Sequence, residues 1–121
     1  MLQDPIADFL VRLKNASMAE KTDVKIRYSN YLKKIADILK DRGFITQVKK
    51  NENDLEVKLN SDQPFTSIKR VSKPGVRYYT GSREIRLNGI STIILTTSKG
   101  ILTGEQAKKQ KVGGEIVAEI M

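Results

Sequence analysis

The sequence contains no cysteine and no histidine among its 121 residues. Without cysteine, the chain can form no disulfide, no thiolate metal site and no cysteine nucleophile. Without histidine, it lacks the most common general base and the most common zinc ligand. We therefore expect neither a bound metal nor a cofactor.

Long apolar runs are also missing. No segment approaches the roughly 20 apolar residues that a membrane-spanning helix needs. Near the N-terminus, Asp4 and Asp8 interrupt the apolar stretch that a secretory signal peptide requires. We expect a soluble protein with no membrane partner, and its 39% hydrophobic content predicts a core of modest size.

Motifs typical of catalysis occur only in fragments. Thr96 and Lys99 have the spacing of the Ser-x-x-Lys motif of some acyl-transfer enzymes, but threonine replaces the serine and the accompanying motifs are absent. A P-loop needs glycines before the lysine and a Ser or Thr after it, whereas here Ser98 precedes Lys99 and Gly100 follows it. No close pair of carboxylates occurs in an apolar setting. We therefore expect no enzymatic activity.

The charge that is present is strongly positive and unevenly distributed. The chain has 22 Lys and Arg residues against 14 Asp and Glu residues, a net charge of +8. Residues 1–65 contribute 12 against 10, whereas residues 66–121 contribute 10 against 4. An excess of this kind indicates a polyanionic partner, and it places the electrostatic footprint mainly in the second half of the chain.

Hydrophobic periodicity predicts a helix, a strand, a second helix and a hairpin in the first half of the chain. Helical stripes with apolar residues at i, i+3, i+4 and i+7 alternate with segments of period two. This order indicates an α+β fold in which the helices cover one face of a sheet. The expected elements are a helix from Asp4-Pro5, a strand over 24–28, a helix between its N-cap Ser29 and Gly43, and strands over 44–50 and 55–60.

The second half of the chain is expected to be mostly β with one short helix. The polar segment 61–64 separates the halves and predicts an α-β-α-β-β subdomain over 1–62 and a second subdomain over 63–121. Thr103 and Gln106 have the spacing of a capping box at the start of the short helix. The remaining expectations are strands over 65–71, 76–80, 90–95 and 115–120, a type II turn at Pro74-Gly75, and an end of the helix at Gly113-Gly114.

Residues 96–100, Thr-Thr-Ser-Lys-Gly, form the strongest candidate for a binding site, and we call them the hydroxyl segment. They follow the apolar residues 93–95, so we expect three hydroxyls, a lysine and a glycine at a strand-to-helix turn. Short hydroxyl side chains donate and accept, and a glycine lets the backbone approach a partner closely. This chemistry suits a ribose-phosphate chain, and in particular the minor groove of A-form RNA, which exposes 2′-hydroxyl groups.

From the residues alone, other roles stay open. A polar strand end explains the hydroxyl segment as well as RNA contact does, and Arg12 and Lys14 fit a solvated helix face as well as a phosphate contact. The sequence shows no zinc finger, no basic-zipper heptads and no recognition helix, so composition does not decide between DNA and RNA. A nonspecific basic binder of nucleic acid and a protein-interaction module are the alternatives.

The chain resembles the small-subunit ribosomal protein S-eight family, and the resemblance runs almost end to end. Its most specific matches are residues 97–100, Thr-Ser-Lys-Gly, and residues 112–115, Val-Gly-Gly-Glu, at their separation in this chain. The other matching positions are 4–8 with Arg12 and Asn15-Ala16, Leu39-Lys40 with 43–45, 69–75, and Leu102-Thr103 with Ala107.

The resemblance implies a structural protein of the small ribosomal subunit that binds a helix in the central domain of the small-subunit rRNA and aids subunit assembly. It implies two small α/β halves, with RNA held chiefly by the C-terminal one, and neighbouring ribosomal proteins as partners. In bacteria it also implies feedback on the messenger RNA of the protein's own operon. Such a protein acts on ribosomes, in the cytoplasm or in an organelle.

The family motifs also assign candidate rRNA-binding residues by position. The hydroxyl segment and the Gly-Gly-Glu motif are the main candidates, the hairpin region supplies weaker ones, and three further cations are candidates by their charge. In this order they are Thr96, Thr97, Ser98, Lys99, Gly100, Gly113, Gly114 and Glu115; Lys73, Arg77 and Tyr79; and Arg12, Lys14 and Lys108.

If the hydroxyl segment binds RNA, replacing Thr97 and Ser98 together with alanine should weaken binding to the cognate RNA helix by about 1–3 kcal/mol, the range of ordinary and charge-assisted hydrogen bonds. Titration of a labelled RNA helix with the folded variant measures the loss. Unchanged affinity in a correctly folded variant would remove these two hydroxyls from the interface.

Overall fold

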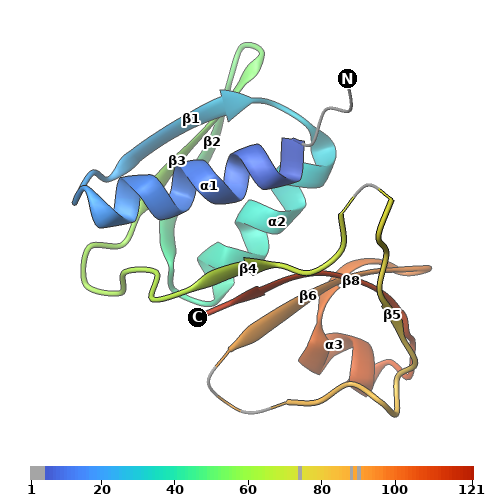
Figure 1. The fold of residues 1–121 in the computed structure, drawn as a ribbon. Coiled ribbons are helices and arrows are strands. Elements are labelled where there is room, and N and C mark those ends of the chain that lie inside the picture. The colour runs from blue at the N-terminus through green and yellow to red at the C-terminus, as the bar shows by residue number, and fades with distance from the viewer. Residues whose placement is uncertain (1–4, 74, 88, 90) are drawn as a thin grey trace. The chain divides into compact units, whose positions relative to one another are not determined.

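A computed structural model of the protein describes residues 5–73, 75–87, 89 and 91–121 (Figure 1). The described residues divide into two compact units, an N-unit that ends at Phe65 and a C-unit from Thr66 to Met121. They form a three-stranded sheet in the N-unit and a five-stranded antiparallel sheet in the C-unit. The predicted α+β fold, with an α-β-α-β-β first half and a mostly β second half with one short helix, is therefore confirmed.

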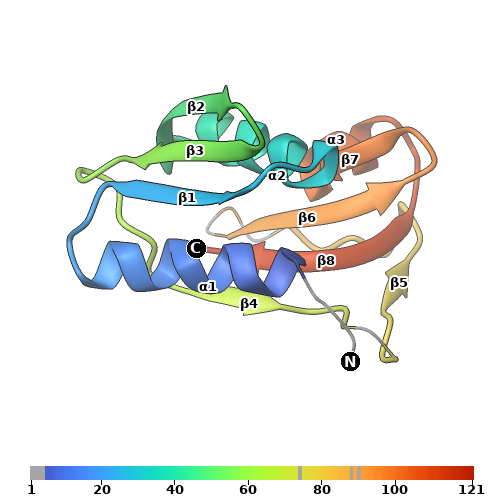
Figure 2. The ribbon, with the colours of Figure 1, turned by 90° about the horizontal axis from the view of Figure 1, so that it is seen from above.

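The N-unit has two helices over one face of its sheet. Helix α1 (Pro5–Met18) contacts β1 (Asp23–Arg27), helix α2 (Asn30–Asp41) contacts β2 (Ile45–Asn51), and β3 (Asp54–Leu59) lies between the two outer strands. Buried and less buried side chains alternate along β1 and β3, so only one face of the sheet is covered. Both helices lie on that face (Figures 1 and 2).

The two helices of the N-unit form where local signals in the sequence predicted them. Along α1 the apolar stripe is buried, and its expected N-cap, Asp4, lies outside the described residues. Helix α2 begins after Ser29, whose Oγ accepts a hydrogen bond from the Leu32 N–H at 3.1 Å. The helix ends before Gly43, where a φ of +90° favours glycine.

The central strand of the C-unit is β8 (Gly114–Ile120). Along one edge it pairs with β6 (Thr92–Thr97), and along the other with β4 (Ile68–Arg70) and β5 (Tyr79–Thr80), one near each of its ends. Strand β7 (Gly100–Thr103) extends the sheet beyond β6. Figure 2 shows β6 and β8 side by side. Because three strands share β8, its register decides which of their side chains become neighbours.

The short helix α3 (Gly104–Lys109) covers one face of the C-unit sheet. It begins at the predicted capping box, in which Thr103 Oγ1 accepts from the Gln106 N–H and Gln106 Oε1 accepts from the Thr103 N–H, both at 3.1 Å. Its Ala107 is buried in a small apolar cluster with Leu95 of β6. Leu95 therefore points toward α3, and the neighbouring positions along the strand, Ile94 and Thr96, point to the opposite face, on which Ile94 is also buried.

The predicted strand over 65–71 is wrong at its start. Only Ile68–Arg70 form a strand, whereas the Phe65 ring stacks on the Phe44 ring with the centroids 4.8 Å apart. Aromatic packing within the N-unit takes Phe65 out of the strand pattern. The strand β4 is correspondingly short.

The hairpin that follows β4 is also less regular than predicted. Lys73 and Val76 exchange backbone hydrogen bonds of 2.8 and 3.0 Å across the turn, and Gly75 has a φ of +86°, as the third residue of a type II turn requires. Pro74 lies outside the described residues. The strand predicted over the return segment is confined to Tyr79–Thr80.

The hydroxyl segment forms a β-hairpin turn, so the predicted strand-to-helix turn is wrong. Strand β6 continues through Thr97, and β7 returns antiparallel beside it before α3 begins. The apolar pair Ile101-Leu102 of β7 is too short a run to identify a strand by its periodicity. Ile90, the expected start of the preceding strand, lies outside the described residues.

The Ser29 cap provides a test of stability in the N-unit. Ser29→Ala should lower the free energy of unfolding by about 1 kcal/mol, because the Leu32 N–H loses its acceptor. Ser29→Asp should retain most of that free energy, because a carboxylate caps a helix as well as a hydroxyl does. Urea unfolding followed by circular dichroism compares the variants, and equal stability of Ser29→Ala and the wild type would contradict the cap.

Candidate nucleic-acid interface

The register of β8 places residues from three strands in one row across the C-unit sheet. Glu115 pairs with Tyr79 of β5 on one side and with Thr96 of β6 on the other. Residues in register project from the same face of a sheet, about 5 Å apart. Because Leu95 points toward α3, this row lies on the opposite face. We call Tyr79, Glu115, Thr96 and the adjoining Arg77 the polar row.

Arg77 adds a positive charge to the polar row. Its Nη1 donates to both carboxylate oxygens of Glu115, at 3.3 and 3.0 Å. The Glu115 side chain is 15% exposed, whereas that of Arg77 is 54% exposed, so the carboxylate is largely enclosed and the guanidinium faces solvent. Removing a partner from such a carboxylate would leave a charge that water solvates only partly, which costs free energy.

The three hydroxyl residues of the hydroxyl segment have unequal roles. Thr97 Oγ1 donates to the Gly100 carbonyl at 2.8 Å and accepts from the Lys99 N–H at 3.1 Å. These two bonds hold the turn, in which Gly100 has a φ of +107°. Ser98 and Lys99 are exposed at its tip. Thr97 therefore shapes the turn, and the turn presents the side chains of Ser98 and Lys99 outward.

Gly113 and Gly114 allow neighbouring strands to approach closely. A Cβ at Gly114 would overlap the Thr96 carbonyl of β6, and a Cβ at Gly113 would overlap the Thr80 carbonyl of β5. The prediction that these glycines end α3 is wrong, because the helix ends earlier and Lys111 takes a left-handed φ of +59°. The two positions require glycine for packing of the backbone and not for a turn.

Three of the weaker candidates are lysines, and they lie in different places. Lys73 is exposed in the hairpin turn that precedes Arg77, and Lys14 is exposed on α1 of the N-unit. Lys108 lies on α3, where its Nζ donates to the Ile85 carbonyl at 3.1 Å. Because α3 covers the other face of the sheet, the fold does not bring Lys108 to the polar row.

Other cations of the N-unit are engaged with neighbours on the same unit. Arg12 donates from Nε to Asp8 and from Nη1 to the Lys25 carbonyl, both at 3.1 Å. On α2 the Lys33 Nζ lies 2.9 Å from Asp37 Oδ2, and this hydrogen bond, together with the negative charge of Asp37, raises the pKa of Lys33. Arg12 thus has a structural role that ties α1 to β1.

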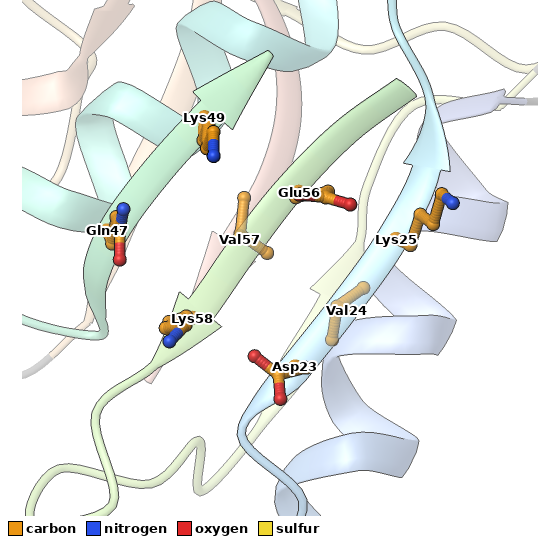
Figure 3. A pocket seen from close by; sticks show the side chains of 8 residues that line it. All are labelled: Asp23, Val24, Lys25, Gln47, Lys49, Glu56, Val57 and Lys58. Atoms are coloured by element: carbon orange, nitrogen blue, oxygen red, sulfur yellow. The ribbon is translucent and has the colours of Figure 1, made fainter. Parts of the chain in front are cut away.

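The uncovered face of the N-unit sheet has a shallow hollow of about 350 Å³ (Figure 3). Lys25 of β1 and Lys49 of β2 flank Glu56 of β3 in register, and Lys25 Nζ lies 3.3 Å from Asp54 Oδ2. Positive and negative side chains therefore alternate across this face. Such a pattern creates no concentrated positive potential for a polyanion, so the hollow is a weaker candidate than the polar row.

The described residues contain no group of three or more Asp, Glu, His or Cys side chains that could hold a metal ion. Within the same ranges, no helix has the length and apolar character needed to cross a membrane. The fold and the polar row define a small basic α+β protein with hydroxyls, an ion pair and an aromatic ring on one sheet face. Such a surface is suited to recognition of a polar partner.

Comparison with known proteins identifies the family. The model of the family described as "Ribosomal protein S8" matches residues 4–121. The chain is 44% identical over 129 residues to small ribosomal subunit protein uS8 of Mycoplasma mobile, which covers 99% of this chain and 97% of that protein. It is 41% identical to the proteins of the same name from Methylacidiphilum infernorum, over 127 residues, and Streptococcus agalactiae, over 130 residues, with at least 98% of each chain covered.

The chain therefore belongs to the ribosomal protein S8 family. This membership confirms the resemblance found in the sequence. It also confirms the prediction that the chain is a structural protein of the translation machinery and not an enzyme.

Sequence reasoning named every member of the polar row but missed its arrangement. Arg77 and Glu115 are 38 residues apart, and no local pattern pairs them. It also missed the internal role of Thr97, whose bond to the Gly100 carbonyl forms in a hairpin turn that the sequence did not predict.

The packing of Gly113 can be tested against a matched glycine. Gly113→Ala should lower the free energy of unfolding by about 1–3 kcal/mol, the usual cost of overpacking, because the new methyl group meets the backbone of Thr80 and Gly81. Gly81→Ala is the control, because the three atoms nearest to its methyl group would belong to the carboxylate of Glu84, which can move away. Chemical unfolding measures the free energy of unfolding of both variants. If Gly113→Ala is as stable as Gly81→Ala, the packing role of Gly113 is ruled out.

Proposed function

We propose that the chain is a structural constituent of the small ribosomal subunit and that its C-unit binds the rRNA of that subunit. The first part is supported by the relatives named small ribosomal subunit protein uS8, which match nearly the whole chain. The observation that carries the second part is the polar row. It brings hydroxyl, carboxylate, guanidinium and aromatic groups together in the half of the chain with 10 basic residues against 4 acidic ones.

The hydroxyls and cations of this surface suit a ribose-phosphate chain. Thr96 and Ser98 carry hydroxyls, which can donate to phosphate oxygens or accept from a 2′-OH. Lys99 at the tip of the turn supplies positive charge, which contributes affinity that falls with salt. Thr97 contributes through the turn that presents Ser98 and Lys99.

The acceptor and the aromatic ring of the row add selectivity. An ionised Glu115 only accepts hydrogen bonds, so it favours partners with donors, such as a 2′-OH or a base amino group. Tyr79 is 72% exposed beside it and offers a face on which a base can stack. Gly113 and Gly114 let the neighbouring strands approach closely, and their backbone is the part of them that can contact RNA.

The resemblance extends the proposal to particular partners. The RNA target is a helix in the central domain of small-subunit rRNA, with neighbouring ribosomal proteins as further partners and, in bacteria, the messenger RNA of the protein's own operon. The second subdomain, from about residue 63 onward, is the rRNA-binding one. The protein acts on the ribosome, in the cytoplasm or in an organelle.

A competition experiment tests the proposal. An irregular RNA helix should displace bound labelled RNA at moderate salt far better than duplex DNA of equal length, because only the RNA offers 2′-OH groups in a wide minor groove. The affinity should also fall steeply as salt is raised. Equal competition by DNA would favour a nonspecific basic binder, and weak salt dependence would favour a protein-interaction module.

Matched lysine variants locate the contact in the same experiment. Lys99→Gln should reduce the slope of log K against log salt by about 1, the value for one lost phosphate contact. Lys49→Gln, on the uncovered face of the N-unit sheet, removes the same charge elsewhere and should leave the slope unchanged. If Lys49→Gln lowers the slope as much as Lys99→Gln, the contact does not lie at the hydroxyl segment.

A further inference from the structure

Glu115 places a negative charge within the surface that is proposed to bind RNA. It lies between Tyr79 and Thr96 in the polar row, and its side chain is 15% exposed. An uncompensated carboxylate at this position would repel the phosphates of any RNA that approaches the row. The surface can therefore use the acceptor atoms of Glu115 only if the charge of Glu115 is balanced locally.

We propose that Arg77 is a positioning residue that acts on RNA through Glu115. Its guanidinium cancels the charge of the carboxylate and holds its two oxygens in place, so that Glu115 can accept hydrogen bonds from RNA on a surface that phosphates can approach. This inference rests on the proposed RNA-binding function. The RNA group that donates a hydrogen bond to Glu115 is a 2′-OH or a base N–H.

The geometry of the ion pair supports this role. A single nitrogen of Arg77, Nη1, lies 3.0 Å from one Glu115 oxygen and 3.3 Å from the other, so the arginine restrains the whole carboxylate group. The guanidinium is the more exposed partner, with 54% exposure against 15%, so a positive charge faces solvent beside a carboxylate that keeps part of its surface open.

The backbone that carries Arg77 is anchored independently of the ion pair. The Tyr78 carbonyl accepts from the Ile116 N–H at 2.9 Å, which ties the segment to β8. The buried Ser72 holds the same residue from the other side, because its Oγ accepts from the Tyr78 N–H at 2.9 Å. Removal of the Arg77 side chain therefore changes the charge at Glu115 while these backbone contacts stay in place.

A direct phosphate contact by Arg77 is the competing explanation, and a double-mutant cycle separates the two. If Arg77 contacts phosphate on its own account, its removal weakens binding equally whether residue 115 is charged or neutral. If it acts through Glu115, its removal weakens binding only when the carboxylate is present, and the two substitutions are strongly non-additive.

The experiment titrates the full chain and its variants Arg77→Gln, Glu115→Gln and the double variant against one irregular RNA helix. Arg77→Gln should lower the affinity about tenfold in the wild-type background and less than about twofold in the Glu115→Gln background, a coupling typical of residues in direct contact. The double variant should bind RNA more tightly than Arg77→Gln alone. Arg77→Lys, which keeps the charge, should retain most of the affinity.

If Arg77→Gln lowers the RNA affinity equally in the wild-type and Glu115→Gln backgrounds, the proposal is overturned. The slope of log K against log salt would then fall by about 1 in each background, as for a phosphate contact. Hydrogen exchange of the Ile116 amide reports whether the segment stays on β8. If Arg77→Gln loses this protection, the test uses Arg77→Lys in its place, because that variant keeps the charge. If Arg77→Lys binds RNA as weakly as Arg77→Gln does, the proposal is overturned. If Arg77→Lys binds RNA nearly as tightly as the wild type does, the proposal is supported.

The wild-type protein separates this inference from the proposed function. A wild-type chain that binds RNA no better than duplex DNA defeats the proposed function. A wild-type chain that prefers RNA but shows no coupling between Arg77 and Glu115 defeats the positioning role alone.

Discussion

The C-unit depends on the close approach of two strands to the start of β8. Because Gly113 and Gly114 have no Cβ, the Thr80 carbonyl reaches the chain from one side and the Thr96 carbonyl from the other. This approach lets β5 and β6 pair with the same end of β8, and the polar row follows from that pairing. A side chain at either glycine would hold one strand away and divide the row. The surface is thus a product of backbone packing at two positions.

Affinity and selectivity come from different groups of this surface. Exposed cations such as Lys99 attract any polyanion and lose strength with salt. Hydroxyls and an oriented carboxylate respond to where a partner has donors and acceptors, and so they distinguish a ribose chain from a deoxyribose one. The Arg77–Glu115 pair joins the two kinds of chemistry, because it keeps an acceptor in a basic unit without adding net negative charge. In the N-unit, by contrast, charges of opposite sign alternate and largely compensate one another.

Local features of the fold were predictable because their causes lie within a few residues. The Ser29 cap and the Thr103–Gln106 capping box are both bonds across three positions, and both form as their spacing predicts. Strand predictions failed where the cause was distant. Phe65 leaves its expected strand to stack on Phe44, and β7 forms from a two-residue apolar run because β6 lies beside it. Period-two patterns are weak in such short segments, so the pairing partner decides.

The sequence by itself determined the absence of cysteine and histidine, the excess of positive charge in the second half and the family motifs, because these depend only on which residues are present. It also determined the N-terminal caps of α2 and α3, which are local hydrogen bonds. Only the tertiary structure decided that Arg77 meets Glu115, that Thr97 turns its hydroxyl into the hairpin, and that the paired glycines serve strand packing. The first and last of these join positions far apart in the chain, and the hydroxyl of Thr97 turns inward in a hairpin that exists only because β7 pairs with β6. Each therefore depends on the register of a sheet, which no short window of residues contains.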